Sequence, residues 1–369
     1  MYYTATDSFS LPIENEPFAS GGEGNLFRTS DNDHQVAKIY HLHKRTKERE
    51  AKLQYMLAHQ PDFQKFGHSA AIWVSDLIYE NGSFSGFSMP YAQGIKLEYL
   101  CGSKIPAFLG NEWKKYDLKY KNAFYLRLKL CFNIAVAISQ IHATGHYVIT
   151  DLKPDNIIIN SAGLVSIVDI DSFQISEGGQ VLFPATAQTP EYSPADRSFT
   201  QAWDRFSMAV IFYRLLFGIH PFTGSCHAPY ENCNSIEELM KNGLFPHSES
   251  KKRYFKKIPP PHLQFNRLDS LIRTLFLQAF EGEQRPSAET WAQALRIYSK
   301  MNIVIKTEEE AKPISIALDK SLKRKEVDFE KAERLYMDSR PIWVKLYTLY
   351  PKESWFHFNH YLYFYFDFQ

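Results

Sequence analysis

One segment near the middle of the chain limits the choice of fold more than any other. Residues 148–173 read VITDLKPDNIIINSAGLVSIVDIDSF. Asp151 stands two residues before Lys153, and a carboxylate beside an ammonium group suits chemistry on an alcohol nucleophile. Asn156 and Asp169 add an amide and a carboxylate, which are the hard oxygen ligands that suit magnesium. The segment therefore predicts a site where a metal ion and a reacting hydroxyl group meet.

This segment resembles the protein kinase family, whose catalytic loop is written HRDLKPEN and whose metal-binding turn is DFG. Asp151, Lys153 and Asn156 keep their relative positions in the loop, and Asp169 follows at the family's usual separation. By that resemblance, Asp151 orients the substrate hydroxyl and accepts its proton, while Lys153 neutralises charge on the γ-phosphate of ATP. Asn156 and Asp169 would then hold magnesium.

The resemblance extends over residues 17–300. The segment TPEYSPAD at 189–196 is similar to the TPEYLAPE segment that closes the activation loop of the family. Asp196 stands in the place of the terminal glutamate, and Arg285 is its expected partner in a buried ion pair. Asp204 resembles the aspartate that braces the catalytic loop from a helix N-terminus.

A glycine-rich segment, ASGGEGNLF, precedes a predicted strand that contains Lys38. Glycine lets a backbone approach phosphates closely, although similar turns are common in ordinary hairpins. The resemblance makes Met89 the gatekeeper of the nucleotide site and 90–92 the hinge between two lobes. Aliphatic residues would enclose the adenine, although the same residues are also ordinary in a core. The expected nucleotide-binding residues are Gly21, Gly22, Gly24, Leu26, Val36, Lys38, Met89, Tyr91 and Ile158.

Lys38 lies inside an apolar strand, QVAKIY, where an unpaired ammonium group would be costly. It therefore needs a carboxylate or phosphate partner. Glu50, on a predicted amphipathic helix at 44–57, is the expected carboxylate, whereas Glu48 points to another face and is expected to be solvated. The expected catalytic residues are thus Asp151, Lys153, Lys38 and Glu50.

The chain departs from the family pattern at three places. Ala19 stands where the first glycine of the phosphate loop usually is, and because alanine is small we expect a stiffer loop that still binds ATP. Ile149 and Thr150 replace the histidine and arginine of HRD, and that arginine would hold a phosphorylated activation loop. We therefore expect activity without loop phosphorylation. Asp171 replaces the glycine of DFG, where it either binds a second metal ion or hydrogen-bonds locally and fixes the turn. The resulting DxDSF turn is similar to that of a group of bacterial eukaryotic-like kinases.

The predicted fold class is α+β, with two lobes and a C-terminal extension. Residues 1–91 are expected to form a small antiparallel β-rich lobe with one helix, which would bind ATP. Residues 92–300 are expected to form a larger, mainly α lobe, and 301–369 an extension of unknown role. The expected strands of the small lobe lie around Leu26 and at 36–40, 71–74 and 84–89. In the large lobe we expect helices at 123–142, 204–217, 270–280 and 288–298, and short strands on either side of a turn at 161–163.

The extension ends in WFHFNHYLYFYFDFQ, in which aromatic and polar residues alternate as in a strand. Three interpretations stay open. The segment is an edge strand, a docking segment for a partner, or a strip that packs against the rest of the chain.

Composition restricts the class of protein only weakly. The formal net charge of +1 gives no general attraction to nucleic acid. The four cysteines lack the spacing of metal ligands and are too few for a disulfide scaffold, which favours a reducing, cytoplasmic compartment. We expect no signal peptide and no apolar stretch long enough to span a bilayer.

The sequence thus favours an enzyme that uses ATP and Mg²⁺ to phosphorylate Ser or Thr hydroxyls of a protein substrate. Lys153 after Asp-Leu and the TPEY segment resemble the serine/threonine branch of the family. The main alternative is a pseudokinase or nucleotide-binding scaffold, suggested by the altered HRD and DFG motifs. A small-molecule phosphotransferase of related fold is the third reading.

Overall fold

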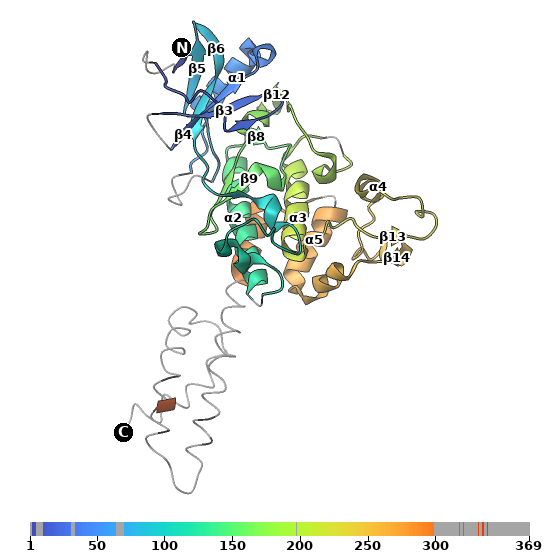
Figure 1. The fold of residues 1–369 in the computed structure, drawn as a ribbon. Coiled ribbons are helices and arrows are strands. Elements are labelled where there is room, and N and C mark those ends of the chain that lie inside the picture. Colours follow the sequence, from blue (N-terminus) through green and yellow to red (C-terminus); the bar gives the residue numbers. More distant parts are fainter. Residues whose placement is uncertain are drawn as a thin grey trace. The chain divides into compact units, whose positions relative to one another are not determined.

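Figure 1 shows the computed structural model of the chain, which divides into two compact units, Met1–Leu295 and Arg296–Gln369. The architecture below belongs to the first unit. The aromatic C-terminal segment lies outside the described residues, so its interpretations stay predictions, as do the predicted domain boundaries. The structure describes residues 2–4, 10–30, 34–63, 70–120, 122–196, 198–282 and 284–298, and isolated positions between 317 and 338.

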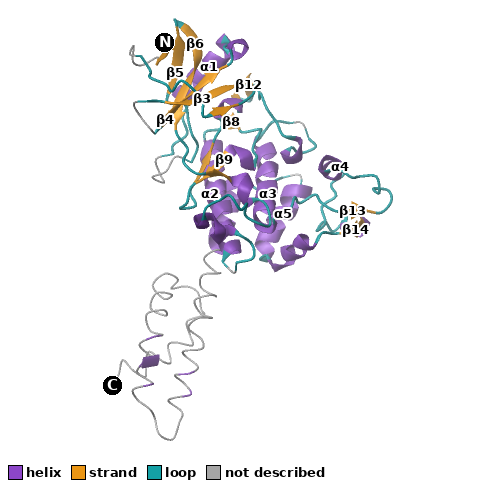
Figure 2. Cartoon of the chain, in the orientation of Figure 1, coloured by secondary structure: helices purple, strands orange, loops and turns teal. Residues whose placement is uncertain are grey.

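The small lobe is an antiparallel sheet with one long helix (Figure 2). Its strands follow the order β1-β5-β6-β4-β3-β2. The strands are β1 (Tyr2–Thr4), β2 (Ala19–Ser20), β3 (Gly24–Arg28), β4 (Gln35–Tyr40), β5 (Asp76–Glu80) and β6 (Ser83–Pro90). Helix α1 (Lys47–Ala58) begins after Thr46, whose hydroxyl accepts a hydrogen bond from the Arg49 amide. The helix packs on β5 and β6 and buries Leu53 and Met56.

Two glycines let neighbouring strands approach the backbone of β4 closely. A Cβ atom at Gly24 would overlap the carbonyl oxygen of Ile39, and one at Gly86 would overlap that of Lys38. No other residue type fits at these positions without a backbone shift. Strand β4, which carries Lys38, therefore has close backbone contacts with β3 on one side and β6 on the other.

The strand predicted at 71–74 is wrong. This run is a buried connection between α1 and β5, and its only ladder contact is an isolated bridge between Ala71 and Ile167. The Ile72 amide donates to the carbonyl oxygen of Ile167 at 2.8 Å. Its side chains are apolar because they are buried, and a short apolar run does not distinguish a strand from a buried connection.

The large lobe is mainly helical, as predicted, and the α+β two-lobed fold class is confirmed (Figure 2). Its helices are α2 (Ala123–Ala143), α3 (Gln201–Phe217), α4 (Ile236–Lys241), α5 (Ser270–Glu281) and a helix at 288–298. One small sheet has the order β10-β9-β7, with β7 (Ile95–Lys96), β9 (Ile157–Ile159) and β10 (Val165–Ile167). Another has the order β12-β11-β8, with β8 (Tyr147–Val148), β11 (Gln174–Glu177) and β12 (Gln180–Phe183). A short pair, β13 (Ser225–Cys226) and β14 (Phe255–Lys257), lies farther along the chain.

Helix α2 is long and apolar enough to cross a bilayer by length and composition alone. In the lobe, however, it packs against α3 and β10, and half of its most apolar 18-residue stretch is buried. Arg127 on this helix is fully buried and donates to the carbonyl oxygens of Tyr116, Leu215 and Gly102 at 2.7, 2.7 and 3.1 Å. The apolar character of α2 is accounted for by its place in the core of the lobe.

Candidate active site

The catalytic loop is held by one fully buried carboxylate at the start of α3. Asp204 accepts hydrogen bonds from the backbone amides of Ile149 at 2.8 Å and Thr150 at 2.9 Å. The indole of Trp203 donates to the carbonyl oxygen of Thr150 at 2.8 Å, and Thr150 has a positive φ of 60°. The expected bracing role of Asp204 is confirmed, and the brace fixes the backbone next to Asp151.

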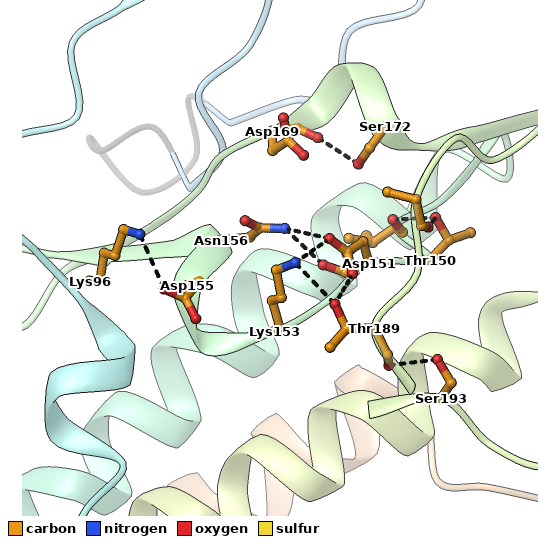
Figure 3. Close-up of polar contacts among 12 residues, drawn as sticks. Lys96, Thr150, Asp151, Lys153, Asp155, Asn156, Asp169, Ser172, Thr189 and Ser193 are labelled. Atoms are coloured by element: carbon orange, nitrogen blue, oxygen red, sulfur yellow. Dashed lines mark hydrogen bonds and ion pairs between the residues drawn. The ribbon is translucent and has the colours of Figure 1, made fainter. Parts of the chain in front are cut away.

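Asp151 faces a hydroxyl group together with a lysine (Figure 3). The Thr189 hydroxyl donates to Oδ1 of Asp151 at 2.6 Å, and Lys153 Nζ lies 2.7 Å from Oδ2. Lys153 also donates to the Thr189 hydroxyl at 3.0 Å. A carboxylate and an ammonium group thus converge on one alcohol oxygen, the arrangement needed to align a hydroxyl for attack.

Asn156 and Asp169 present oxygen atoms suited to a metal ion. The amide nitrogen of Asn156 donates to the backbone and side-chain oxygens of Asp151 at 3.0 and 3.2 Å, so its Oδ1 faces away from Asp151 (Figure 3). The Asp169 side chain is 37% exposed. Within the described residues, no three His, Cys, Asp or Glu side chains group as metal ligands. Two protein oxygens fit Mg²⁺, which in nucleotide sites takes its other ligands from phosphates and water.

A cavity of about 530 Å³ lies next to these groups. Asn156 and Asp169 line it, together with the glycine-rich turn and the segment 90–92 that leads into the large lobe. All nine residues that the sequence assigns to nucleotide binding line it as well: Gly21, Gly22, Gly24, Leu26, Val36, Lys38, Met89, Tyr91 and Ile158. The sequence reasoning did not include Ile72 and Val168, which also line the cavity. Neither residue belongs to a motif that would mark it.

Comparison with known proteins shows that the chain is similar to protein kinases. The protein kinase domain model matches residues 20–295. Protein kinase YegI of Escherichia coli O157:H7 is 27% identical over 312 residues, which cover 79% of this chain and 45% of the relative. Drp72 of Corynebacterium efficiens, described among serine/threonine-protein kinases, is 30% identical over 136 residues, or 35% of this chain and 24% of the relative. Citron rho-interacting kinase of Rattus norvegicus is 26% identical over 184 residues, or 47% and 8%.

The chain belongs to the protein kinase domain family. It spans less than half the length of the two YegI relatives. Each of these two alignments covers 79% of this chain.

The carboxylate partner predicted for Lys38 is wrong. Lys38 Nζ lies 2.7 and 2.9 Å from the two carboxylate oxygens of Asp171 and 3.0 Å from Oδ1 of Asp169. Glu50 instead accepts a hydrogen bond from the Tyr79 hydroxyl at 2.7 Å. The reason is the orientation of α1. The buried residue of α1 that contacts the turn at 169–171 is Lys52, and two positions along a helix amount to about 200° of rotation.

Helix α1 therefore contributes two positively charged side chains, Lys52 and Arg49, next to the cavity. Lys52 donates to the backbone carbonyl of Asp171 at 2.7 Å. Arg49 lies over the ring of Tyr40 at 4.5 Å and forms an ion pair with Glu23 of the glycine-rich turn. The sequence analysis assigned no role to Lys52, Arg49, Tyr40 or Glu23. Tyr40 carried a usable signal, because side chains two apart on a strand share a face and Tyr40 follows Lys38 by two.

The ammonium group of Lys38 and the carboxylates of Asp169 and Asp171 shift one another's pKa values. Burial by itself would lower the pKa of Lys38, but Asp171 and then Asp169 outweigh that effect and raise it above its usual range. Burial raises the pKa of Asp169. Burial acts in the same sense on Asp171, but Lys38 and the Tyr40 hydroxyl reverse the effect and hold the pKa of Asp171 low. Asp171 is thus the carboxylate more firmly tied to Lys38.

The activation segment is held by strand pairing near its start and by side-chain contacts farther along. Strand β11 pairs with β8 and β12, and the Gln174 side chain donates to the carbonyl oxygen of Phe199 at 2.9 Å. The expected pair of Arg285 with Asp196 is confirmed at 2.8 Å. Its predicted burial is wrong, because the Asp196 side chain is 54% exposed.

Proposed function

We propose that this chain transfers the γ-phosphate of ATP, with Mg²⁺, to serine or threonine hydroxyls of a protein substrate. The observation that carries this proposal is the hydroxyl of Thr189, held between Asp151 and Lys153 beside the cavity. It indicates where an acceptor hydroxyl would lie. Relatives described as serine/threonine kinases support the same acceptor class.

The proposed mechanism assigns a task to each group of the cavity. Leu26, Val36 and Ile158 would enclose the adenine, and Lys38 would hold the phosphates. Asn156 and Asp169 would hold Mg²⁺, which when bound neutralises charge on the phosphate oxygens.

On the acceptor side, Asp151 would orient the substrate hydroxyl and accept its proton. Lys153 would stabilise the charge that develops on the transferred group. Because Asp151 is nearly buried and already hydrogen-bonded to Asn156, its carboxylate is fixed before substrate arrives.

We also propose that the activation segment needs no phosphate. Thr150 stands where the family has an arginine, and its hydroxyl donates to the carbonyl oxygen of Ile149 at 2.8 Å, so no cation is offered there to a phosphorylated residue. Pairing of β11 with β8 already orders the segment. These observations support activity of the unmodified chain.

A nucleotide-binding scaffold is the second candidate. The contact of Lys38 with Asp169 favours it, because that contact occupies one oxygen of a proposed metal ligand. The two candidates differ in one result. An enzyme transfers phosphate in the presence of Mg²⁺, whereas a scaffold binds nucleotide without transfer.

A cytoplasmic location is part of the proposal. The cysteines at 101, 131, 226 and 233 are all free, and the first three are buried. Free buried thiols suit a reducing compartment.

The acceptor class is tested by phosphoamino-acid analysis. The kinase is incubated with labelled ATP, Mg²⁺ and a set of generic protein substrates, and the labelled residues are identified after hydrolysis. We expect phosphoserine and phosphothreonine. An Asp151→Asn variant controls for contaminating kinases, because it keeps the shape of the side chain but cannot act as a base. Label mainly on tyrosine would contradict the proposal.

A further inference from the structure

Both carboxylate oxygens of Asp171 are engaged in contacts with neighbouring side chains. Its two oxygens contact Lys38 Nζ at 2.7 and 2.9 Å, and one also accepts the Tyr40 hydroxyl hydrogen at 2.7 Å. Only 4% of its side chain is exposed, against 37% for Asp169. Of the two carboxylates in the turn, Asp171 therefore points inward to the lysine and Asp169 stays accessible.

Helix α1 offers no carboxylate that could hold Lys38. Glu50 is occupied by Tyr79, and Glu48 is exposed. The side chain that does reach the metal-binding turn is that of Lys52, which donates to the carbonyl oxygen of Asp171. Asp171 thus contacts two lysines, Lys38 of β4 through its carboxylate and Lys52 of α1 through its backbone carbonyl.

We propose that Asp171 is the positioning residue that holds Lys38 for the nucleotide phosphates, and that it is not a metal ligand. This inference rests on the proposed function and decides between the two roles that the sequence leaves open for Asp171. A metal ion at its carboxylate would have to displace both Lys38 and the Tyr40 hydroxyl. Breaking this buried ion pair would leave Lys38 with Asp169 alone, which is the more exposed and more distant of its two carboxylate partners, and loss of a buried partner is strongly unfavourable.

The arrangement has a consequence for control of the kinase. Because Asp171 and Asp169 belong to the same turn, one short segment fixes both the lysine and the proposed metal ligand. The lysine needs no carboxylate delivered by a movement of α1. Helix α1 contributes instead by donating from Lys52 to the backbone of the turn.

The kinetic test compares two isosteric changes that each remove one carboxylate charge. Asp171→Asn should lower kcat about 10- to 100-fold, the effect of losing a hydrogen bond to a charged group. The Mg²⁺ concentration for half-maximal rate should stay unchanged. Glu50→Gln is the matched control and should leave kcat as in the unmodified chain.

Two kinetic outcomes would overturn the inference. One is a loss in Glu50→Gln as large as that in Asp171→Asn. The other is an increased Mg²⁺ requirement in Asp171→Asn, which would make Asp171 a metal ligand. Thermal unfolding of both variants is measured alongside, so that a folding defect is not read as a kinetic effect.

A crystal structure of the unmodified kinase with Mg²⁺ and a non-hydrolysable ATP analogue tests the inference without any transfer. We expect Lys38 within hydrogen-bonding distance of Asp171, and Asp171 outside the coordination shell of the metal. A Lys38–Glu50 pair, or Asp171 bound to Mg²⁺, would overturn it. Absence of phosphate transfer by the unmodified chain would count against the proposed function alone.

Discussion

At the scale of single residues, the strongest constraint is the buried charge of Lys38. An ammonium group inside a sheet is tolerated only with partners, and here Asp171 and Asp169 supply them. The three charges depend on one another, because two carboxylates two residues apart would repel without the lysine between them. The ammonium group of Lys38 therefore contributes to the stability of the fold and also belongs to the proposed nucleotide site.

The first prediction concerns this cluster. Lys38→Met should lower the free energy of unfolding by about 3–5 kcal/mol, because it leaves a buried carboxylate unpaired. Urea unfolding at neutral pH measures the change. Lys96→Met is the control, since its ion pair with Asp155 is about half exposed and should contribute less than about 1 kcal/mol. Equal losses in both variants would mean that the Lys38 pairs do not stabilise the fold.

At the scale of elements, the activation segment and α1 make contacts that differ from those that the sequence motifs predict. The segment is ordered by its β-pairing with β8. Helix α1 contacts the turn at 169–171 through a lysine and not through a glutamate. The activation segment is paired through its backbone, where the family pattern uses an arginine. Helix α1 contributes a lysine where a glutamate was expected.

The second prediction follows from the activation segment. Thr186 is exposed, so Thr186→Ala should change the rate of transfer by no more than about twofold, as is usual for surface substitutions. Thr189→Ala should reduce the rate much more, because its hydroxyl contacts Asp151 and Lys153. Initial rates with one protein substrate compare them. A large loss in Thr186→Ala that Thr186→Glu restores would show that phosphorylation is needed after all.

At the scale of the whole molecule, the sequence predicted the two lobes and the catalytic loop because local motifs determine them. Asp151, Asn156 and Asp169 are close in the chain, and their spacing is enough to bring Asn156 and Asp169 to one cavity and Asp151 into hydrogen-bond contact with Asn156. The partner of Lys38 could not be predicted in this way. Which face of α1 meets the sheet depends on the packing of Leu53 and Met56, and a rotation of the helix exchanges one charged residue for another.

Burial also explains the other errors. The run at 71–74 is apolar for the same reason as a strand, yet it only connects two elements. The exposure of Asp196 depends on surfaces that no single segment encodes. Sequence patterns report which residues avoid water, whereas pairing and orientation depend on contacts between distant parts of the chain.

The most direct test of the central claim is phosphate transfer by the unmodified chain beside Asp169→Ala. Both proteins are incubated with labelled ATP, Mg²⁺ and a protein substrate, and nucleotide binding is measured by calorimetry on the same samples. We predict label on the substrate with the unmodified chain and none with Asp169→Ala, while the variant still binds nucleotide through the apolar walls of the cavity. Nucleotide binding without transfer by the unmodified chain would contradict the account and identify the protein as a scaffold.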